Sequence, residues 1–185
     1  MNPQPSSLQP FSGSGDLSGS SDPPELKISG TLSRHSNTLA INYELSGSLD
    51  RIKIPLPESK PVRKNRLWEE TCFELFIGIK GTDPYWEFNF SPSGDWNIYR
   101  FDDYRKGMAE ETAFSTLPFC VTHTPDSLKM ILEISLNKIL PPAQALQAGI
   151  SAVIKNNHGN ITYWALTHPG PKPDFHQPDS FILEL

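Results

Sequence analysis

Hydrophobic and polar residues alternate strictly through most of the chain after residue 25. Leu39, Ile41, Tyr43 and Leu45 occupy every second position of one segment, and residues 128–136 repeat the pattern. A period of two places successive side chains on opposite faces of a strand, so each run predicts a β-strand with one buried face. Turn-forming residues separate about ten such runs, roughly 8–12 residues apart, and almost no segment has helical periodicity. The pattern predicts an all-β, antiparallel, jelly-roll-like sandwich.

The block between Trp68 and Met108 alternates in the same way, but its second face is polar as well as aromatic. Glu74 follows Phe73 on the opposite face of one strand, and Glu87 and Asn89 share a face of the next. A face that combines aromatic rings, carboxylates and amides suits a ring-shaped, hydroxyl-rich ligand. A solvated face or a structural ion pair is the competing interpretation.

The turn after this second strand leaves the register of the third open. A two-residue loop at Ser93-Gly94 places Glu87 opposite Arg100, a favourable pair of charges. A slip of one residue places Glu87 opposite Tyr99 instead. We favour the contact between Glu87 and Arg100.

Composition changes sharply at residue 25. Residues 1–24 are dominated by Pro, Ser and Gly, with Leu8, Phe11 and Leu17 as their large apolar residues. Such a segment buries too little surface to offset its ordering entropy, so we predict a disordered tail. The remaining residues, 25–185, have the length of a single domain.

Charge and cysteine content exclude several classes of protein. The net charge of −5 gives no basic face for nucleic acid, and no apolar run approaches the roughly 20 residues that span a bilayer. No Lys or Arg precedes Lys27 and no apolar segment follows the first residues, so we expect no secretory signal. Cys72 and Cys120 are too few for a disulfide framework, and both are expected to be small buried residues. A cytoplasmic protein with reduced thiols is the simplest expectation.

Two sets of polar residues are candidates for chemistry. Glu74 and Glu87 are a conceivable acid and nucleophile for glycoside cleavage, but we favour ligand contact or a structural ion pair as the explanation of two such glutamates. His168, Asp174 and His176 lie in one proline-rich loop without a recognised zinc spacing. They are candidate metal ligands, but we favour the alternative that Asp174, Phe175 and His176 pin the loop to the mouth of the sandwich or border a ligand.

The tryptophans divide into two pairs. Trp86 and Trp96 stand within strands and are expected in the core. Trp68 follows a basic, loop-like segment and Trp164 precedes a long loop, so both suit a platform on which a sugar ring stacks.

Three segments carry a resemblance to a known family: LWEETCFELFIG, YWEFNFSPSGDWNIYRFDDYRKGM and WALTHPGPKPDFHQPDSFILEL. They resemble the DOMON-like family related to type 9 carbohydrate-binding modules, in a subgroup of small bacterial proteins, from about residue 26 to 185. The resemblance implies a jelly-roll-like sandwich with a ligand cleft on one sheet. Other DOMON domains carry haem, which Met108 with a histidine would ligate.

In the related modules, two tryptophans clamp a terminal sugar while charged and amide side chains hold its hydroxyls. The spacing of Trp68 and Glu74 matches the stacking tryptophan and hydroxyl-binding glutamate, and Arg100 and Trp164 fall near the expected arginine and second tryptophan. We therefore expect a non-catalytic domain that binds a small carbohydrate or sugar-like metabolite, with no cofactor. A haem or redox module and a glycoside-active enzyme are the alternatives. The predicted site comprises Trp68, Glu74, Glu87, Asn89, Arg100, Tyr104, Arg105 and Trp164.

Overall fold

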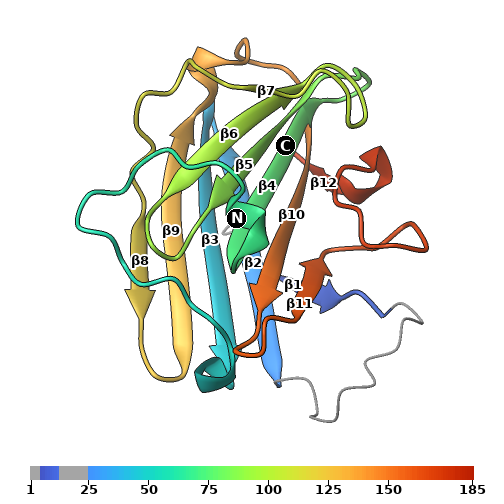
Figure 1. Cartoon of the computed structure of the whole chain (residues 1–185). Helices are drawn as coiled ribbons and strands as arrows, with labels where there is room; N and C mark the ends of the chain where they lie inside the picture. Colours follow the sequence, from blue (N-terminus) through green and yellow to red (C-terminus); the bar gives the residue numbers. More distant parts are fainter. Residues whose placement is uncertain (1–4, 13–24) are drawn as a thin grey trace.

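Antiparallel strands form nearly all of the regular secondary structure (Figure 1). The computed structural model describes residues 5–12 and 25–185. The strands are β1 (Ser6–Pro10), β2 (Leu26–His35), β3 (Thr38–Gly47), β4 (Cys72–Ile79), β5 (Tyr85–Phe90), β6 (Trp96–Phe101), β7 (Ala109–Glu110), β8 (Cys120–His123), β9 (Ser127–Ser135), β10 (Leu146–Lys155), β11 (Ile161–Ala165) and β12 (Leu183–Glu184). Short 3-10 helices are η1 (Leu49–Arg51), η2 (Leu67–Glu69), η3 (Leu136–Lys138) and η4 (Pro178–Ser180).

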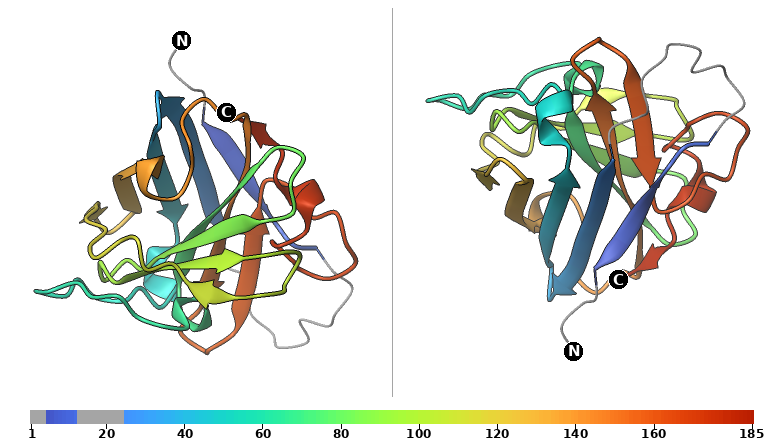
Figure 2. Two further views of the ribbon diagram at one scale, coloured as in Figure 1. Left: turned by 90° about the horizontal axis from the view of Figure 1, so that it is seen from above. Right: turned by 90° about the horizontal axis from the view of Figure 1, so that it is seen from below.

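The strands form one hydrogen-bonded path in the order β7-β6-β5-β4-β10-β11-β1-β2-β3-β9-β8, and β12 pairs with β10. The path curls so that the half from β7 to β11 faces the half from β2 to β8 (Figure 2). Apolar side chains of both halves fill the space between them. The predicted all-β sandwich is therefore confirmed.

Strand β1 connects the two halves. It pairs with β11 on one side, where Pro10 lies opposite Trp164, and with β2 on the other, where Leu8 lies opposite Ile28. The prediction of a disordered tail is wrong at residues 6–10, because Leu8 is buried in the core and the β1 backbone completes two ladders. Residues 1–4 and 13–24 of the predicted tail lie outside the described residues.

The inner faces follow the alternation of the sequence. In β3 the four alternating apolar residues from Leu39 to Leu45 are buried, and β9 buries residues 128, 130, 132 and 134 opposite them. Strand β5 contributes Trp86 and β6 contributes Trp96 to the same core, as predicted. Alternation thus assigns these inner faces correctly because successive side chains of a strand point to opposite faces.

Strands β4 and β5 are buried on both faces. Their outer faces carry a second apolar cluster that includes Phe76 and Tyr85, and the segment 168–181 contributes Phe175 and Phe181 to this cluster. Phe76 stacks on Phe181 with ring centroids 5.8 Å apart. The segment after β11 therefore folds back over the outer face of the sheet and forms a wall above it.

A three-residue loop sets the register of β5 and β6. The backbone amide of Ser91 donates to the carbonyl of Asp95, and Gly94 takes a positive φ of 95° within the loop. Glu87 consequently lies opposite Tyr99, and the predicted contact between Glu87 and Arg100 is wrong. The extra residue in the turn shifts every pair by one, so Arg100 points to the opposite face of the strand.

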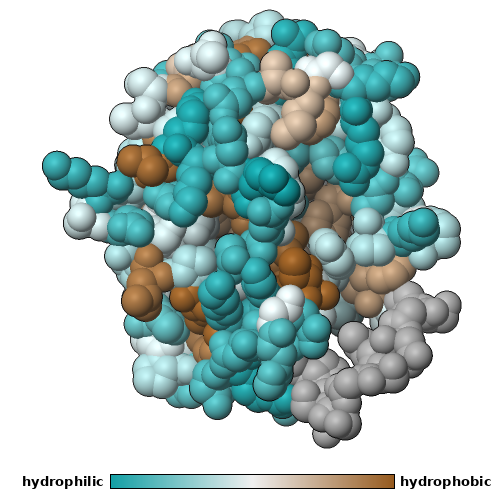
Figure 3. All heavy atoms as spheres, viewed as in Figure 1, coloured by the Kyte–Doolittle hydropathy of each residue, from teal (hydrophilic) through white to brown (hydrophobic). Residues whose placement is uncertain are grey.

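The surface is mainly hydrophilic on the side shown in Figure 3, where hydrophobic residues form separate patches. Leu56, Val62, Ile131 and Ile182 are large apolar residues that are more than half exposed. Cys72 is buried as expected, whereas Cys120 is exposed because it lies on the short edge strand β8. Within the described residues, no helix has the length and apolar character needed to cross a membrane.

Candidate functional site

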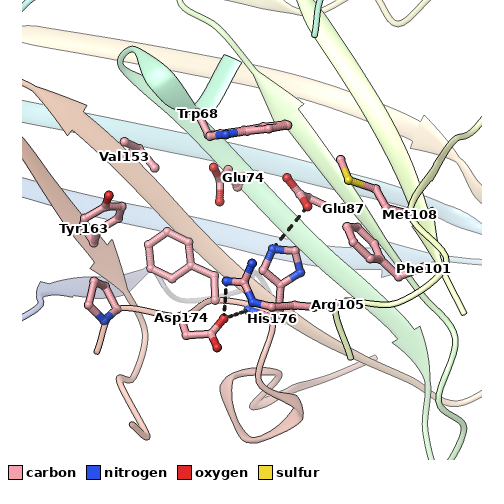
Figure 4. Close-up of a pocket in the computed structure, with 12 residues that line it drawn as sticks. Trp68, Glu74, Glu87, Phe101, Arg105, Met108, Val153, Tyr163, Asp174 and His176 are labelled. Carbon is pink, nitrogen blue, oxygen red and sulfur yellow. Dashed lines mark hydrogen bonds and ion pairs between the residues drawn. The ribbon is translucent and has the colours of Figure 1, made fainter. Parts of the chain in front are cut away.

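A cavity of about 310 Å³ lies on the outer face of the sheet, between β4, β5, β10 and the wall formed by residues 168–181. Its volume is near the lower end of the range of roughly 300–1,000 Å³ for small-molecule sites. Aromatic and charged residues share the lining (Figure 4). The lining residues are Trp68, Glu74, Glu87, Phe101, Arg105, Met108, Val153, Tyr163, Pro173, Asp174, Phe175 and His176.

Trp68 forms one side of the cavity. It stands in η2, whose preceding residue Arg66 takes a left-handed conformation with φ of 63° and turns the chain onto the sheet. The indole contacts Tyr99 edge to face, with centroids 5.6 Å apart. Figure 4 shows its ring above Glu74 and Glu87. This packing holds an aromatic face over two carboxyl groups.

Glu74 and Glu87 form the floor of the cavity. Glu74 in β4 lies opposite Asn89 of β5, two residues from Glu87 on the same face. Asn89 Nδ2 donates to Glu87 Oε1 over 2.7 Å, and Ser151 Oγ donates to Glu74 Oε2 over 3.3 Å. Asn89 is fully buried and is outside the cavity lining, so it orients Glu87 rather than bordering the cavity.

Burial changes the ionisation of both carboxyl groups. Desolvation raises the pKa of Glu87 to about 7, although the Asn89 hydrogen bond and the charge of Arg105 oppose this change. The pKa of Glu74 is raised well above its ordinary value, first by burial and then by the nearby charge of Glu87. Near neutral pH Glu87 is therefore partly protonated, so this carboxyl can either donate or accept hydrogen bonds.

His176 closes the opposite side of the floor. Its Nδ1 lies 2.8 Å from Tyr85 Oη, and its Nε2 lies 3.6 Å from Glu87 Oε2. Burial, with a further contribution from the charge of Arg105, lowers the pKa of His176 to about 4. The imidazole is therefore neutral near pH 7 and supplies no positive charge to the glutamates.

Asp174 connects the wall to the turn that follows β6. Arg105 Nη2 donates to Asp174 Oδ1 over 2.7 Å, and Tyr104 Oη donates to Oδ2 over 2.5 Å. The backbone amide of His176 also donates to Asp174 Oδ1, over 3.1 Å. Tyr104, for which the sequence predicts a position at the rim, contacts the wall and is not among the residues that line the cavity.

Asp174→Asn is expected to loosen the wall without unfolding the domain. Arg105 is half exposed, so losing this ion pair should lower the free energy of unfolding by about 1 kcal/mol or less. Hydrogen exchange at residues 174–181 should become faster. Glu44→Gln, which removes the exposed ion pair with Lys129 on the other half of the sandwich, is the matched control. Equal exchange in both variants would contradict the role of Asp174.

Two predicted site residues lie away from the cavity. Trp164 lies opposite Ala152 and packs into the inner core, where its Nε1 donates to Thr162 Oγ1. Arg100 is exposed and pairs with Asp102 over 3.1 Å. Both were assigned to the wrong face, because the register of each hairpin decides which of two neighbouring residues points outward.

Tyr163 takes the outward position that was predicted for Trp164. It lies opposite Val153, and both border the cavity. The alternation in ITYWAL places Tyr163 and Trp164 on opposite faces, but it does not say which face lines a cavity. Phe101, Met108 and Pro173 also line the cavity and were not predicted as binding residues.

The three candidate metal ligands do not meet. Asp174 and His176 line the cavity, but His168 Nε2 lies 2.9 Å from the carbonyl oxygen of Gln9 and its ring contacts Phe11. Across residues 5–12 and 25–185, no group of three or more His, Cys, Asp or Glu residues is placed to hold a metal ion. The arrangement instead agrees with the alternative that these residues pin the loop.

Comparisons with known proteins identify the fold. No protein-family model and no curated protein match the sequence. A Bacteroides uniformis protein described as a candidate carbohydrate-binding protein has a similar structure, with a TM-score of 0.71, 12% identity, and coverage of 97% of this chain and 84% of that one. A family 9 carbohydrate-binding module from Caldicellulosiruptor kristjanssonii, solved with cellotriose, gives a TM-score of 0.55, 13% identity, and coverage of 99% and 81%.

Proposed function

We propose that the domain binds a small carbohydrate or sugar-like metabolite in this cavity, without catalysis. The observation that carries the proposal is the position of Trp68 over the paired carboxyl groups of Glu74 and Glu87. The aromatic face matches the apolar C–H face of a pyranose, and the two carboxyl groups suit its hydroxyls, which both donate and accept hydrogen bonds. Tyr163 and Arg105 supply further polar groups at the sides.

The structural neighbours support this proposal at the level of fold. One neighbour was solved in complex with cellotriose, and the other is described as a candidate carbohydrate binder. A fold hosts many functions, so the site carries the argument and the neighbours agree with it. We also propose that the protein is a DOMON-like, cytoplasmic protein of bacterial origin.

Trp68→Ala is expected to weaken sugar binding at least tenfold, about 1.4 kcal/mol, because it removes the stacking surface. Calorimetric titration with glucose and short oligosaccharides measures this change. Trp164→Phe is the matched control: it alters a buried tryptophan of the inner core and should leave the affinity unchanged. Equal affinities of wild type and Trp68→Ala would contradict the stacking role.

Glycoside cleavage is a second candidate because both carboxyl groups face one cavity. Diagonal neighbours on paired strands have backbones about 7–8 Å apart, and the carboxyl groups of glycosidases are separated by roughly 5–10 Å. The raised pKa of Glu87 also suits an acid. Release of nitrophenol from aryl glycosides, abolished by Glu87→Gln, would establish catalysis and overturn the non-catalytic proposal.

Haem does not fit this cavity. Met108 and His176 both line it, but Nδ1 of His176 is hydrogen-bonded to Tyr85 and Nε2 faces Glu87. Iron ligation requires one of these contacts to break and places the iron beside a buried glutamate. We therefore expect no Soret band after haem is added to the purified protein.

A further inference from the structure

The cavity contains more acidic groups than basic ones. Glu74, Glu87 and Asp174 line it, and Arg105 is the one lysine or arginine among the lining residues. Arg105 is paired with Asp174 at 2.7 Å, and His176 is neutral near pH 7. The positive charge of Arg105 is therefore balanced within the wall, so the ionised form of either floor glutamate would lack a full counter-charge of its own.

The carboxyl group of Glu74 is the less satisfied of the two. Its residue is only 3% exposed, yet within the described residues it accepts a single long hydrogen bond, from Ser151. Figure 4 shows the group pointing into the cavity between Trp68 and Arg105. The other oxygen of this carboxyl opens into the cavity, where a cationic group of a ligand can reach it.

Aromatic rings surround this acidic floor. Trp68, Phe101, Tyr163 and Phe175 line the cavity around Glu74 and Glu87. Aromatic faces attract ammonium groups through the quadrupole of the ring, and the attraction grows when water is excluded. A positively charged group seated between Trp68 and the floor would contact both an aromatic face and the carboxylates.

We propose that the preferred ligand is an amino sugar, whose ammonium group binds between Trp68 and the carboxylates of Glu74 and Glu87. This inference rests on the proposed carbohydrate binding and names the charge of its ligand. The hydroxyls of the ring contact the same polar groups as in a neutral sugar. The ammonium group adds charge-assisted hydrogen bonds, which are roughly twice as strong as neutral ones.

Binding of an ammonium group is coupled to proton release. Burial favours the protonated forms of Glu74 and Glu87, and a cation between them favours the ionised forms. The other titratable groups that line the cavity are Arg105, Asp174, His176 and Tyr163. Arg105 and Asp174 remain paired and charged, and His176 is neutral, so the glutamates release the protons.

The test compares glucose, its 2-amino and 6-amino derivatives, and N-acetylglucosamine by calorimetric titration at about pH 7. We expect at least one amino sugar to bind about tenfold more tightly than glucose and N-acetylglucosamine. Its apparent binding enthalpy should differ between two buffers of unequal ionisation enthalpy, because protons are released, whereas that of glucose should not. At about pH 5, where Glu87 is mostly protonated, the preference should shrink.

The near-isosteric variants Glu74→Gln and Glu87→Gln test the origin of the preference. Each should remove most of the tenfold discrimination while glucose binding changes less. Glu133→Gln is the matched control, because Glu133 is exposed on β9 in the other half of the sandwich. If either site variant fails to fold, the two-buffer comparison on the wild type still decides the outcome.

The outcomes separate the two proposals. Equal affinity for glucose and both amino sugars overturns the amino-sugar inference and leaves carbohydrate binding intact. Cyclohexylammonium, a ring-shaped cation without hydroxyls, is titrated as a further probe. If it binds and no sugar does, both carbohydrate binding and the amino-sugar inference are overturned. Absence of binding to every probe overturns both.

Discussion

The free energy of unfolding of Glu87→Gln should exceed that of wild type by an amount that grows as the pH rises from about 4.5 to about 7. In the folded protein burial raises the pKa of Glu87 from 4.5 to about 7. Between these values the folded state holds a proton that the unfolded chain has released, so the free energy of unfolding of the wild type falls with pH. The difference amounts to about 3 kcal/mol, and glutamine, which does not ionise, does not incur it.

The lowered pKa of His176 makes stability depend on pH in the opposite direction. Its pKa is lowered from 6.5 to about 4, so the folded state lacks a proton that the unfolded chain binds, and stability is lost as the pH falls through this range. In the wild type, Glu87 and His176 therefore make opposing contributions to the pH dependence of the free energy of unfolding. Because His176 is present in both proteins, its contribution largely cancels when the two are compared.

Urea unfolding at a series of pH values measures the effect. The free energies of the variant and the wild type should diverge in favour of Glu87→Gln above about pH 5. Glu133→Gln, which changes an exposed residue, is the control, and its free energy of unfolding should vary with pH as that of wild type does. Parallel curves for Glu87→Gln and wild type would show that the folded state does not raise the pKa of Glu87.

Phe76→Ala should destabilise the domain by about 3–5 kcal/mol and open the cavity wall. Phe76 is 1% exposed on the outer face of β4, between the sheet and the wall. It stacks on Phe181 and contacts Phe175 and His176, with centroids 6.4 and 5.1 Å away. Without the ring, the wall loses its main apolar support, so His176 no longer holds its position beside Glu87.

Phe88→Ala distinguishes this local effect from general destabilisation. Phe88 is fully buried on the inner face of β5, so its loss should cost a similar free energy without removing a contact of the wall. Hydrogen exchange at residues 174–181, measured where both variants remain folded, should accelerate far more in Phe76→Ala. Similar exchange in the two variants would show that Phe76 does not support the wall.

Part of the site is predictable from sequence, because alternation within a single strand decides which side chains share a face. Glu74 and Glu87 were assigned to polar faces from alternation alone, and the structure places both in the cavity. The sequence also predicts that Trp68 and Arg105 belong to the site. For Trp68 the prediction rests on its loop context and on the family resemblance, which matches its spacing to Glu74. The sequence identifies Asp174 and His176 as polar residues of one loop, which pin it to the sandwich, border a ligand or bind a metal, but it does not place them beside Glu87.

Other parts depended on contacts between distant segments. A single additional residue in the turn after β5 moved Arg100 away from Glu87, and the pairing of β11 with β10 turned Tyr163 rather than Trp164 toward the cavity. Polar composition before residue 25 concealed β1, whose backbone pairs with the next strand, β2, and with the distant strand β11. Backbone pairing of this kind leaves little trace in side-chain composition.

The sequence by itself determined the fold class and the two faces of β3, β4, β5 and β9. It did so because side chains alternate along each strand whatever the partner strand is. Only the tertiary structure decided that the outer face of β4 and β5 is covered, and that Trp68 and the wall of residues 168–181 enclose Glu74 and Glu87. That enclosure raises the pKa of both glutamates, and burial of this kind arises from the packing of segments about 100 residues apart.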